Sequence, residues 1–134
     1  MAARIYLDSC MIIDLIEGDD TQRRRIAQAI GSKSLISSDL AWMECRVSPL
    51  QLLDFSALKQ YESFFQLTEI ISLNRPVFDL ATQLRVKHRL KTPDALHLAA
   101  AITAECDEFW TIDTRLRLAA AQYLTSPDWT PQKP

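Results

Sequence analysis

Four acidic residues stand at or near the ends of predicted strands, where α/β proteins place their binding sites. They come from four distant parts of the chain: Asp8, Glu44, Asp94 and Asp113. Carboxylates gathered at one sheet edge repel each other unless a cation lies among them. Oxygen ligands around a partly hydrated ion suit Mg²⁺ or Mn²⁺, so the four acids predict a site for one or two such ions. Each acid taken alone also fits a structural role, as a helix cap or a solvated surface residue.

Other polar residues lie close to these acids in the sequence. His97 follows Asp94 by one helical turn and is predicted to support the site through a hydrogen bond. Ser9 and Thr111 are predicted to orient water or carboxylates, although capping and strand packing explain them equally well. Four basic residues are predicted to bind the phosphates of a polyanion: Arg46, Arg85, Arg89 and Lys91. A solvated helix surface is the alternative for the basic run, and an ion pair with a neighbouring acid is the alternative for Arg46.

Strands and helices alternate in the predicted order of elements. Strands are predicted in ARIYLD, in SLIS, over residues 69–73, and in EFWTI before Asp113. Helices are predicted over residues 11–18, 21–30, 40–47, 49–65, 76–88, 94–105 and 114–122, with Thr92 as a cap and Pro93 in a first turn. This order predicts one α/β domain over residues 1–125, with a central parallel sheet of four or five strands and helices on both faces. The proline-containing residues 126–134 are predicted to be a C-terminal tail.

Composition excludes several classes of function. The chain has 134 residues, of which 48% are hydrophobic and 24% charged, as in an ordinary globular domain. It has two glycines, Gly18 and Gly31, too few for a glycine-rich phosphate loop of a dinucleotide-binding protein or an ATPase. The three cysteines form no C-x-x-C pair, so neither a disulfide framework nor a zinc knuckle is indicated.

The same composition bears on location and partners. No apolar run is long enough to span a membrane, and the charged residues Arg4 and Asp8 leave no room for a secretory signal. We therefore expect a cytoplasmic protein with no membrane partner. The formal net charge is −2, so a polyanionic partner would have to bind to local basic patches.

Four segments around the acids are similar to the sequence motifs of a known family: IYLDSCMIIDLIEG, SSDLAWMECRV, LRVKHRLKTPDALHLAAA and FWTIDTRL. They resemble the PIN-domain ribonucleases, and within them the VapC-type toxins of bacterial toxin–antitoxin pairs. The third segment is the most specific, because TPDALHLA-like helices are typical of the family. Two positions differ from the usual pattern, with Ile112 and Cys10 where the family commonly has asparagine.

This resemblance implies a fold, an activity and partners. The fold is a PIN-like domain, in which Asp8, Glu44, Asp94 and Asp113 take the places of the family's acidic quartet. The activity is Mg²⁺-dependent endoribonuclease hydrolysis of RNA, in which metal-activated water leaves a 5′-phosphate and a 3′-hydroxyl. The implied partners are an RNA substrate, a cognate antitoxin and a second copy of the chain in a homodimer.

Two other functions remain as alternatives. One is a non-catalytic PIN-like module that binds RNA or a partner protein, against which the retention of four mutually repelling acids argues. The other is a phosphoryl-transfer domain, which also places an aspartate after the first strand. Asp8-Ser9-Cys10 lacks the second aspartate of a D-x-D phosphatase, and no lysine stands directly after a late strand.

Overall fold

A sheet of four parallel strands forms the centre of the structure. The computed structural model describes residues 2–130. The strands are β1 (Arg4–Leu7), β2 (Ser34–Ser38), β3 (Glu69–Ile71) and β4 (Glu108–Trp110). They pair side by side in the order β3-β2-β1-β4. The predicted α/β class and parallel sheet are confirmed, with four strands.

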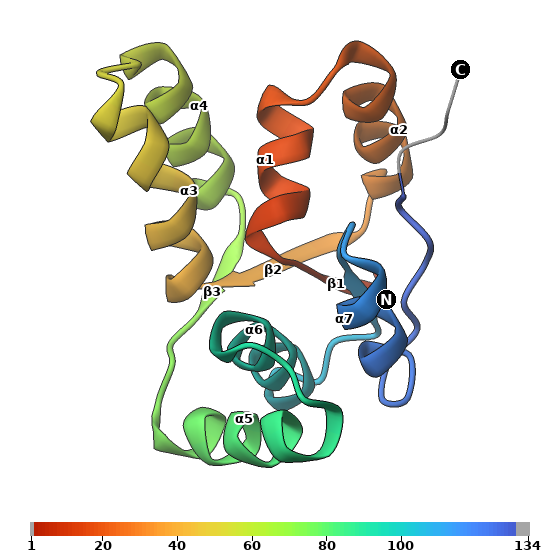
Figure 1. Ribbon diagram of the computed structural model, residues 1–134. Coiled ribbons are helices and arrows are strands. Elements are labelled where there is room, and N and C mark those ends of the chain that lie inside the picture. The colour runs from red at the N-terminus through yellow and green to blue at the C-terminus, as the bar shows by residue number, and fades with distance from the viewer. Residues whose placement is uncertain (1, 131–134) are drawn as a thin grey trace.

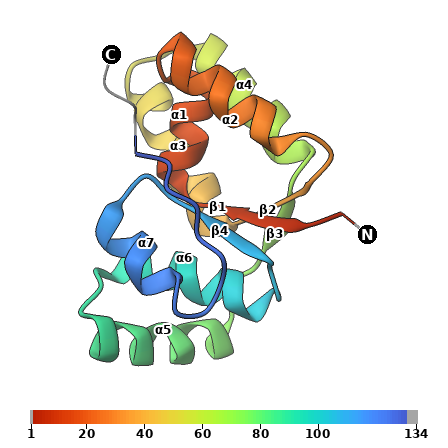
Figure 2. The ribbon, with the colours of Figure 1, turned by 90° about the vertical axis from the view of Figure 1, so that its right-hand side faces the viewer.

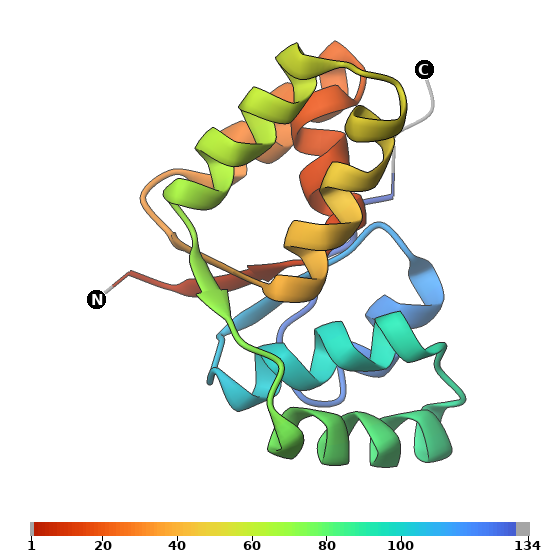
Figure 3. The ribbon, with the colours of Figure 1, turned by 90° about the vertical axis from the view of Figure 1, so that its left-hand side faces the viewer.

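Helices cover both faces of this sheet (Figure 1). One layer consists of α1 (Ser9–Glu17), α2 (Asp20–Ile30), α3 (Asp39–Gln51) and α4 (Phe55–Gln66). The opposite layer consists of α5 (Arg75–His88), α6 (Thr92–Thr103) and α7 (Thr114–Ala120). Helix α6 lies against the sheet and α5 packs on its outer side (Figure 3). Within residues 2–130, every helix is too short or too polar to cross a bilayer.

Strand β1 shows how one sheet serves two layers. Because successive side chains of a strand point to opposite faces, Tyr6 packs in the core beneath α5–α7 while Ile5 and Leu7 pack in the core beneath α1–α4. All three side chains are fully buried. Strand β1 is therefore held by packing on both faces of the sheet. This packing also fixes the position of Asp8, which follows the strand directly.

The predicted helix over residues 49–65 is wrong. Pro49 lies inside the last turn of α3, which ends at Gln51, and α4 begins only at Phe55. The chain turns at Leu53, whose φ of 54° lies in the left-handed region. That conformation is uncommon for a leucine, so the sequence carries no local signal for the break.

Two further boundaries differ from prediction. Thr92 is not a cap, because α6 begins at this residue and Lys91 occupies the N-cap position without a side-chain bond. The Thr92 hydroxyl instead accepts a hydrogen bond from Arg85. Strand β4 ends at Trp110 rather than continuing to Asp113, because Asp113 caps α7 with its carboxylate.

The predicted tail, residues 126–134, contributes to the core as far as it is described. We call residues 125–130 the C-terminal strap; it runs along the edge of the sheet from the α7 side to the α2 side (Figure 2). Trp129 is 6% exposed, and its ring lies 4.6 Å from that of Trp110 and 4.9 Å from the Arg25 guanidinium. The last four residues lie outside the described part of the chain. The strap therefore ties the two helical layers together at the β4 edge.

Candidate metal site at the carboxyl edge of the sheet

Two of the acids follow neighbouring strands. Asp8 comes directly after β1, and Asp113 follows β4, the strand next to β1. The backbone N–H of Asp8 donates to the Trp110 carbonyl over 3.2 Å, which joins the two strand ends. The carboxyl ends of parallel strands lie at one edge of a sheet, so this pairing brings both acids to the same crevice.

Asp8 is the most enclosed of the acids. It is 3% exposed and caps α1, with its carboxylate accepting from the Met11 N–H at 2.9 Å. Burial is the main cause that raises the pKa of Asp8, and the charge of Asp94 raises it further. The opposing contributions of His97, Thr111 and the Met11 N–H do not cancel that rise. A buried carboxylate with raised pKa is a group that a cation would stabilise in its charged form.

Glu44 is held by two hydrogen bonds. Its Oε1 lies 2.7 Å from His97 Nε2 and accepts from the Ser9 hydroxyl at 3.0 Å. Burial alone would raise the pKa of Glu44, but the contacts with His97 and Ser9 outweigh burial and lower it. Glu44 is thus kept ionised in one orientation, as a ligand for a hard cation requires.

His97 connects Glu44 to the interior. The ring is 2% exposed, and its Nδ1 lies 2.7 Å from the Tyr6 hydroxyl, which in turn donates to Ser38 Oγ at 2.8 Å. The sequence predicted that His97 supports the site next to Asp94. The structure places its hydrogen bond on Glu44 instead, from the opposite helical layer.

Asp94 and Asp113 complete the group from the α6–α7 side. Asp94 stands in the first turn of α6, and burial followed by the charge of Asp113 raises its pKa, with Lys91 and His97 lowering it less. Asp113 is exposed; its carboxylate accepts from the Leu116 N–H, and its own N–H donates to Thr111 Oγ1 at 3.1 Å. The contribution of Asp113 to this rise indicates that the two carboxylates repel each other.

Cys10 lies among all four acids. Burial raises the pKa of its thiol to about 12, and further contributions come from the charges of the four acids, Asp8, Asp94, Glu44 and Asp113. The charges of the four predicted acids therefore all act on one side chain, and their role as metal ligands stays a prediction. The sequence marked Cys10 only as a departure from the family pattern, because cysteine beside an aspartate has no distinctive spacing.

The four acids fit a hydrated divalent ion in the kind of donors they offer. All are carboxylates, and the pKa values of Asp8 and Asp94 are raised first by burial and then by the charge of neighbouring acids. Within residues 2–130, no three His, Cys, Asp or Glu side chains are arranged closely enough to enclose an ion directly. Mg²⁺ commonly keeps several waters and takes only one or two carboxylates, so this open spacing suits it better than an ion such as Zn²⁺.

The predicted phosphate-binding residues are engaged differently. The Arg46 guanidinium stacks on Trp42 at 3.7 Å from the ring centre and donates to the Trp42 carbonyl. Arg85 donates to the Leu90 carbonyl and to Thr92. The remaining two, Arg89 and Lys91, are exposed. The structure thus commits two of the four basic side chains to the fold.

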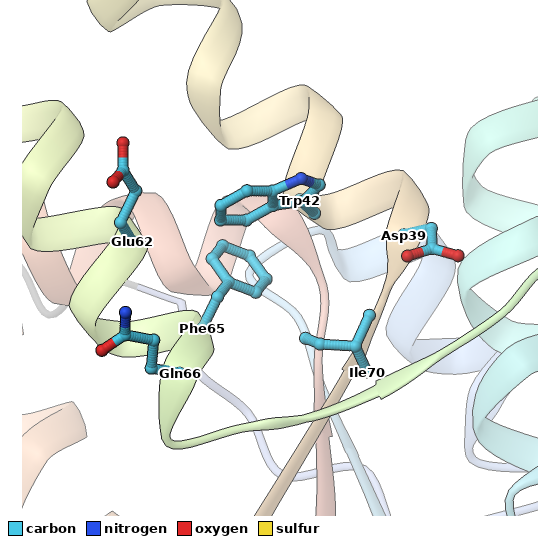
Figure 4. A pocket seen from close by; sticks show the side chains of 6 residues that line it. All are labelled: Asp39, Trp42, Glu62, Phe65, Gln66 and Ile70. Carbon is cyan, nitrogen blue, oxygen red and sulfur yellow. The ribbon is translucent and has the colours of Figure 1, made fainter.

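A separate pocket lies between α3, α4 and β3 (Figure 4). It has a volume of about 360 Å³, and its lining residues are Asp39, Trp42, Glu62, Phe65, Gln66 and Ile70. None of the four acids is among them. This hollow, with an apolar floor and acidic rim, is therefore distinct from the acidic crevice.

Comparison with known proteins identifies the family. No curated, characterised protein matches the chain. A chain of a toxin–antitoxin complex from Klebsiella pneumoniae is 25% identical, with a TM-score of 0.69 over 82% of this chain and 87% of that one. Two further solved structures share the fold. FitAcB from Neisseria gonorrhoeae is 17% identical, with a TM-score of 0.75 over 93% of this chain and 97% of that one. The sarcin–ricin loop cleaving toxin VapC20 from Mycobacterium tuberculosis is 14% identical, with a TM-score of 0.71 over 90% of this chain and 96% of that one. The profile of the PIN domain matches residues 5–122, so this chain belongs to the PIN domain family.

Proposed function

We propose that this chain is a metal-dependent endoribonuclease, a hydrolase that acts as the toxin of a toxin–antitoxin pair. The observation that carries the proposal is that Asp8 and Asp113 follow the neighbouring strands β1 and β4, with Glu44 held beside Asp8 by its bonds to Ser9 and His97. Family membership supports the same activity, and similarity to chains of toxin–antitoxin complexes supports the same biological setting.

In this proposal the acids hold one or two Mg²⁺ or Mn²⁺ ions: Asp8, Glu44, Asp94 and Asp113. A bound divalent cation supplies Lewis acidity, which makes water a better nucleophile and neutralises charge on the phosphate. Ser9 and His97 fix Glu44, and Thr111 Oγ1 accepts a hydrogen bond from the backbone N–H of Asp113. Ile112 offers no polar atom at the position where the family commonly has an amide, so Asp113 depends on Thr111 and Leu116 for its orientation.

The proposal includes two protein partners, a cognate antitoxin and a second copy of this chain. Large apolar side chains stand exposed where α3 passes into α4, at Leu50, Leu52, Leu53 and Phe55. Each is about half exposed or more, which is unusual for side chains of this size unless a partner covers them. We expect mass measurement of the protein in solution, alone and with the antitoxin, to show both assemblies.

A non-catalytic binding module is the second candidate, and the acids decide between the two. A module that only binds RNA gains nothing from four repelling carboxylates, which destabilise the fold and repel phosphates. Burial is the main cause that raises the pKa values of Asp8 and Asp94, and the charges of neighbouring acids add to it, so holding these carboxylates together costs free energy that a mere binding module would not need.

Cleavage of single-stranded or loop RNA by the purified protein tests the proposal. We expect cleavage with Mg²⁺ or Mn²⁺, none with excess chelator, and products that end in 5′-phosphate. Asp8→Asn and Asp94→Asn should each remove nearly all activity, while the more exposed Asp113 should leave a residual rate after Asp113→Asn. Asp39→Asn, which alters an acid in the first turn of α3 outside the quartet, serves as the matched control. Cleavage that persists in chelator, or products with 2′,3′-cyclic phosphate ends, would contradict the mechanism.

A further inference from the structure

The basic residues near the turn between α5 and α6 differ in their contacts: one holds the turn together, and the others are exposed and form no ion pair within residues 2–130. Arg85 is structural: its Nε donates to the Leu90 carbonyl and its Nη1 to Thr92 Oγ1, each at 3.0 Å. These two bonds fasten the end of α5 to the start of α6. Two of the five N–H donors of the guanidinium hold the turn, so Arg85 contributes to ligand binding first through the shape of that turn.

Three other basic side chains surround the same turn, and we call them the basic rim: Arg89, Lys91 and Arg115. All three are exposed, and none forms an ion pair with another residue in the range 2–130. Arg115 reaches across from α7 and donates through Nη2 to the Arg89 carbonyl at 2.9 Å. The rim is therefore a contiguous group of positive charges drawn from two separate segments.

The basic rim begins at the acidic crevice. Lys91 is close enough to Asp94 to lower the pKa of that carboxyl, and Arg115 stands two residues after Asp113. The remaining charges of the rim extend away from the acids along the turn. Positive charge next to an acidic metal site is what a phosphodiester chain needs, because one phosphate lies at the ion and its neighbours need separate counterions.

An aromatic side chain stands at the far end of the rim. His88, adjacent to Arg89, has its Nε2 2.7 Å from the Tyr123 hydroxyl, and the Lys87 ammonium lies 5.9 Å from the Tyr123 ring. Tyr123 is 39% exposed, so part of its ring is open to solvent. Aromatic rings interleaved with basic groups suit single-stranded nucleic acid, whose unpaired bases stack on them.

We propose that the RNA strand leaves the acidic crevice over the basic rim, with its phosphates on Arg89, Lys91 and Arg115 and one base stacked on Tyr123. This inference rests on the proposed nuclease function and assigns the side of the site on which the substrate is held. An acidic protein segment could also meet the three charges, but it would have no use for the exposed ring of Tyr123.

RNA binding, measured apart from cleavage, tests the proposal. The probe is a fluorescent single-stranded RNA, and the protein carries Asp94→Asn in every sample so that binding is read without turnover. Arg89→Gln and Arg115→Gln should each make the salt dependence of the association constant shallower, by about 0.7 per lost phosphate contact. Tyr123→Ala should weaken binding about tenfold, whereas Tyr123→Phe, which keeps the ring, should not.

Two control variants separate this surface from general charge effects. Arg24→Gln removes a charge from α2, in the other helical layer, and should leave the salt slope unchanged. Arg85→Gln should lower the thermal midpoint but keep the salt slope, because Arg85 binds the turn and not the strand. The proposal is overturned if Arg89→Gln and Arg115→Gln match Arg24→Gln, if Arg85→Gln lowers the slope as they do, or if the rim variants weaken only an acidic protein partner. Failure of the wild-type protein to cleave RNA would instead reject the nuclease function and leave these slopes readable.

Discussion

His97 Nε2 lies 2.7 Å from Glu44 Oε1, and this contact joins two helices on opposite faces of the sheet. Glu44 belongs to α3 in one layer, and His97 belongs to α6 in the other. The two meet at the edge of the sheet, 53 positions apart in the chain. The same ring also contacts the buried Tyr6 of the central strand. One histidine therefore links the acidic crevice to both layers and to the core between them.

Replacement of this histidine should destabilise the protein. His97→Ala leaves the Tyr6 hydroxyl without one of its two partners and Glu44 without its strongest one. Unsatisfied buried polar groups cost about 1–3 kcal/mol each, so we expect the free energy of unfolding in urea to fall by at least that amount. His88→Ala, which alters a half-buried histidine bonded to Tyr123, should change it by less than about 0.5 kcal/mol. Equal effects of the two variants would show that the contact with Glu44 contributes nothing.

Removal of one charge from the crevice should stabilise the metal-free protein. Asp94→Asn keeps the shape of the side chain and relieves repulsion from Asp113 and Glu44, on the order of 1 kcal/mol in total. It gives up about 0.3–1 kcal/mol of favourable interaction with the α6 dipole. We expect the thermal midpoint in chelator to rise by up to a few degrees.

Magnesium should reverse that order. A cation bound only by the folded protein stabilises it, so millimolar Mg²⁺ should raise the midpoint of the wild type more than that of Asp94→Asn. Asp39→Asn is the control, because Asp39 also stands in a first helical turn but outside the quartet. It should lower the midpoint in chelator and leave the response to Mg²⁺ intact. If Asp94→Asn behaves like Asp39→Asn in both conditions, Asp94 does not belong to a shared metal site.

The thiol of Cys10 should report the charges around it. Its pKa is raised to about 12, first by burial and then by the four carboxylates, so little thiolate exists at pH 8. Iodoacetamide should therefore alkylate Cys10 more slowly than free cysteine. Asp94→Asn removes one of the anions that raise this pKa, which increases the thiolate fraction and should speed alkylation about threefold. Mass spectrometry of the Cys10 peptide measures the rate, and an unchanged rate would place Asp94 away from Cys10.

The C-terminal strap should be part of the folding unit. Trp129→Ala removes the ring that packs on Trp110 and under the Arg25 guanidinium. A buried tryptophan truncated to alanine costs about 3–5 kcal/mol, so we expect a loss of that size in urea denaturation. Leu67→Ala truncates a side chain that is 84% exposed and should cost less than about 0.5 kcal/mol. A loss for Trp129→Ala as small as that for Leu67→Ala would mean that the strap is only loosely attached.

The order of strands and helices could be predicted because local signals marked it. Apolar strands alternate with capped helices, and a residue such as Asp19 or Asn74 caps its helix through its own side chain. The turn at Leu53 could not be predicted, since leucine rarely adopts a left-handed conformation and only packing of α3 against α4 imposes it. The burial of Trp129 was hidden for the same reason, because its partners Trp110 and Arg25 are distant in the chain.

The residues of the candidate site could be proposed from the sequence, but the hydrogen bonds among them could not. The strand ends and the family resemblance indicated all four acids, whose charges all raise the pKa of Cys10, and their role in holding a metal stays a prediction. Sequence spacing suggested that His97 would serve Asp94, one turn away, but the ring turns to Glu44 on another helix. Likewise Arg85 resembled its neighbours in the basic run, and only its bonds to Leu90 and Thr92 distinguish it.

The break between α3 and α4 has a consequence for dissecting the protein. It divides the chain into two pieces that each carry two of the four acids, and the pieces interleave in the sheet, since β1 and β2 lie between β3 and β4. Neither piece alone holds a complete crevice. If the proposed nuclease function holds, a chain cut at Leu53 and supplied as two fragments would be inactive until the fragments associate, and RNA cleavage would then report their association, as in a split enzyme.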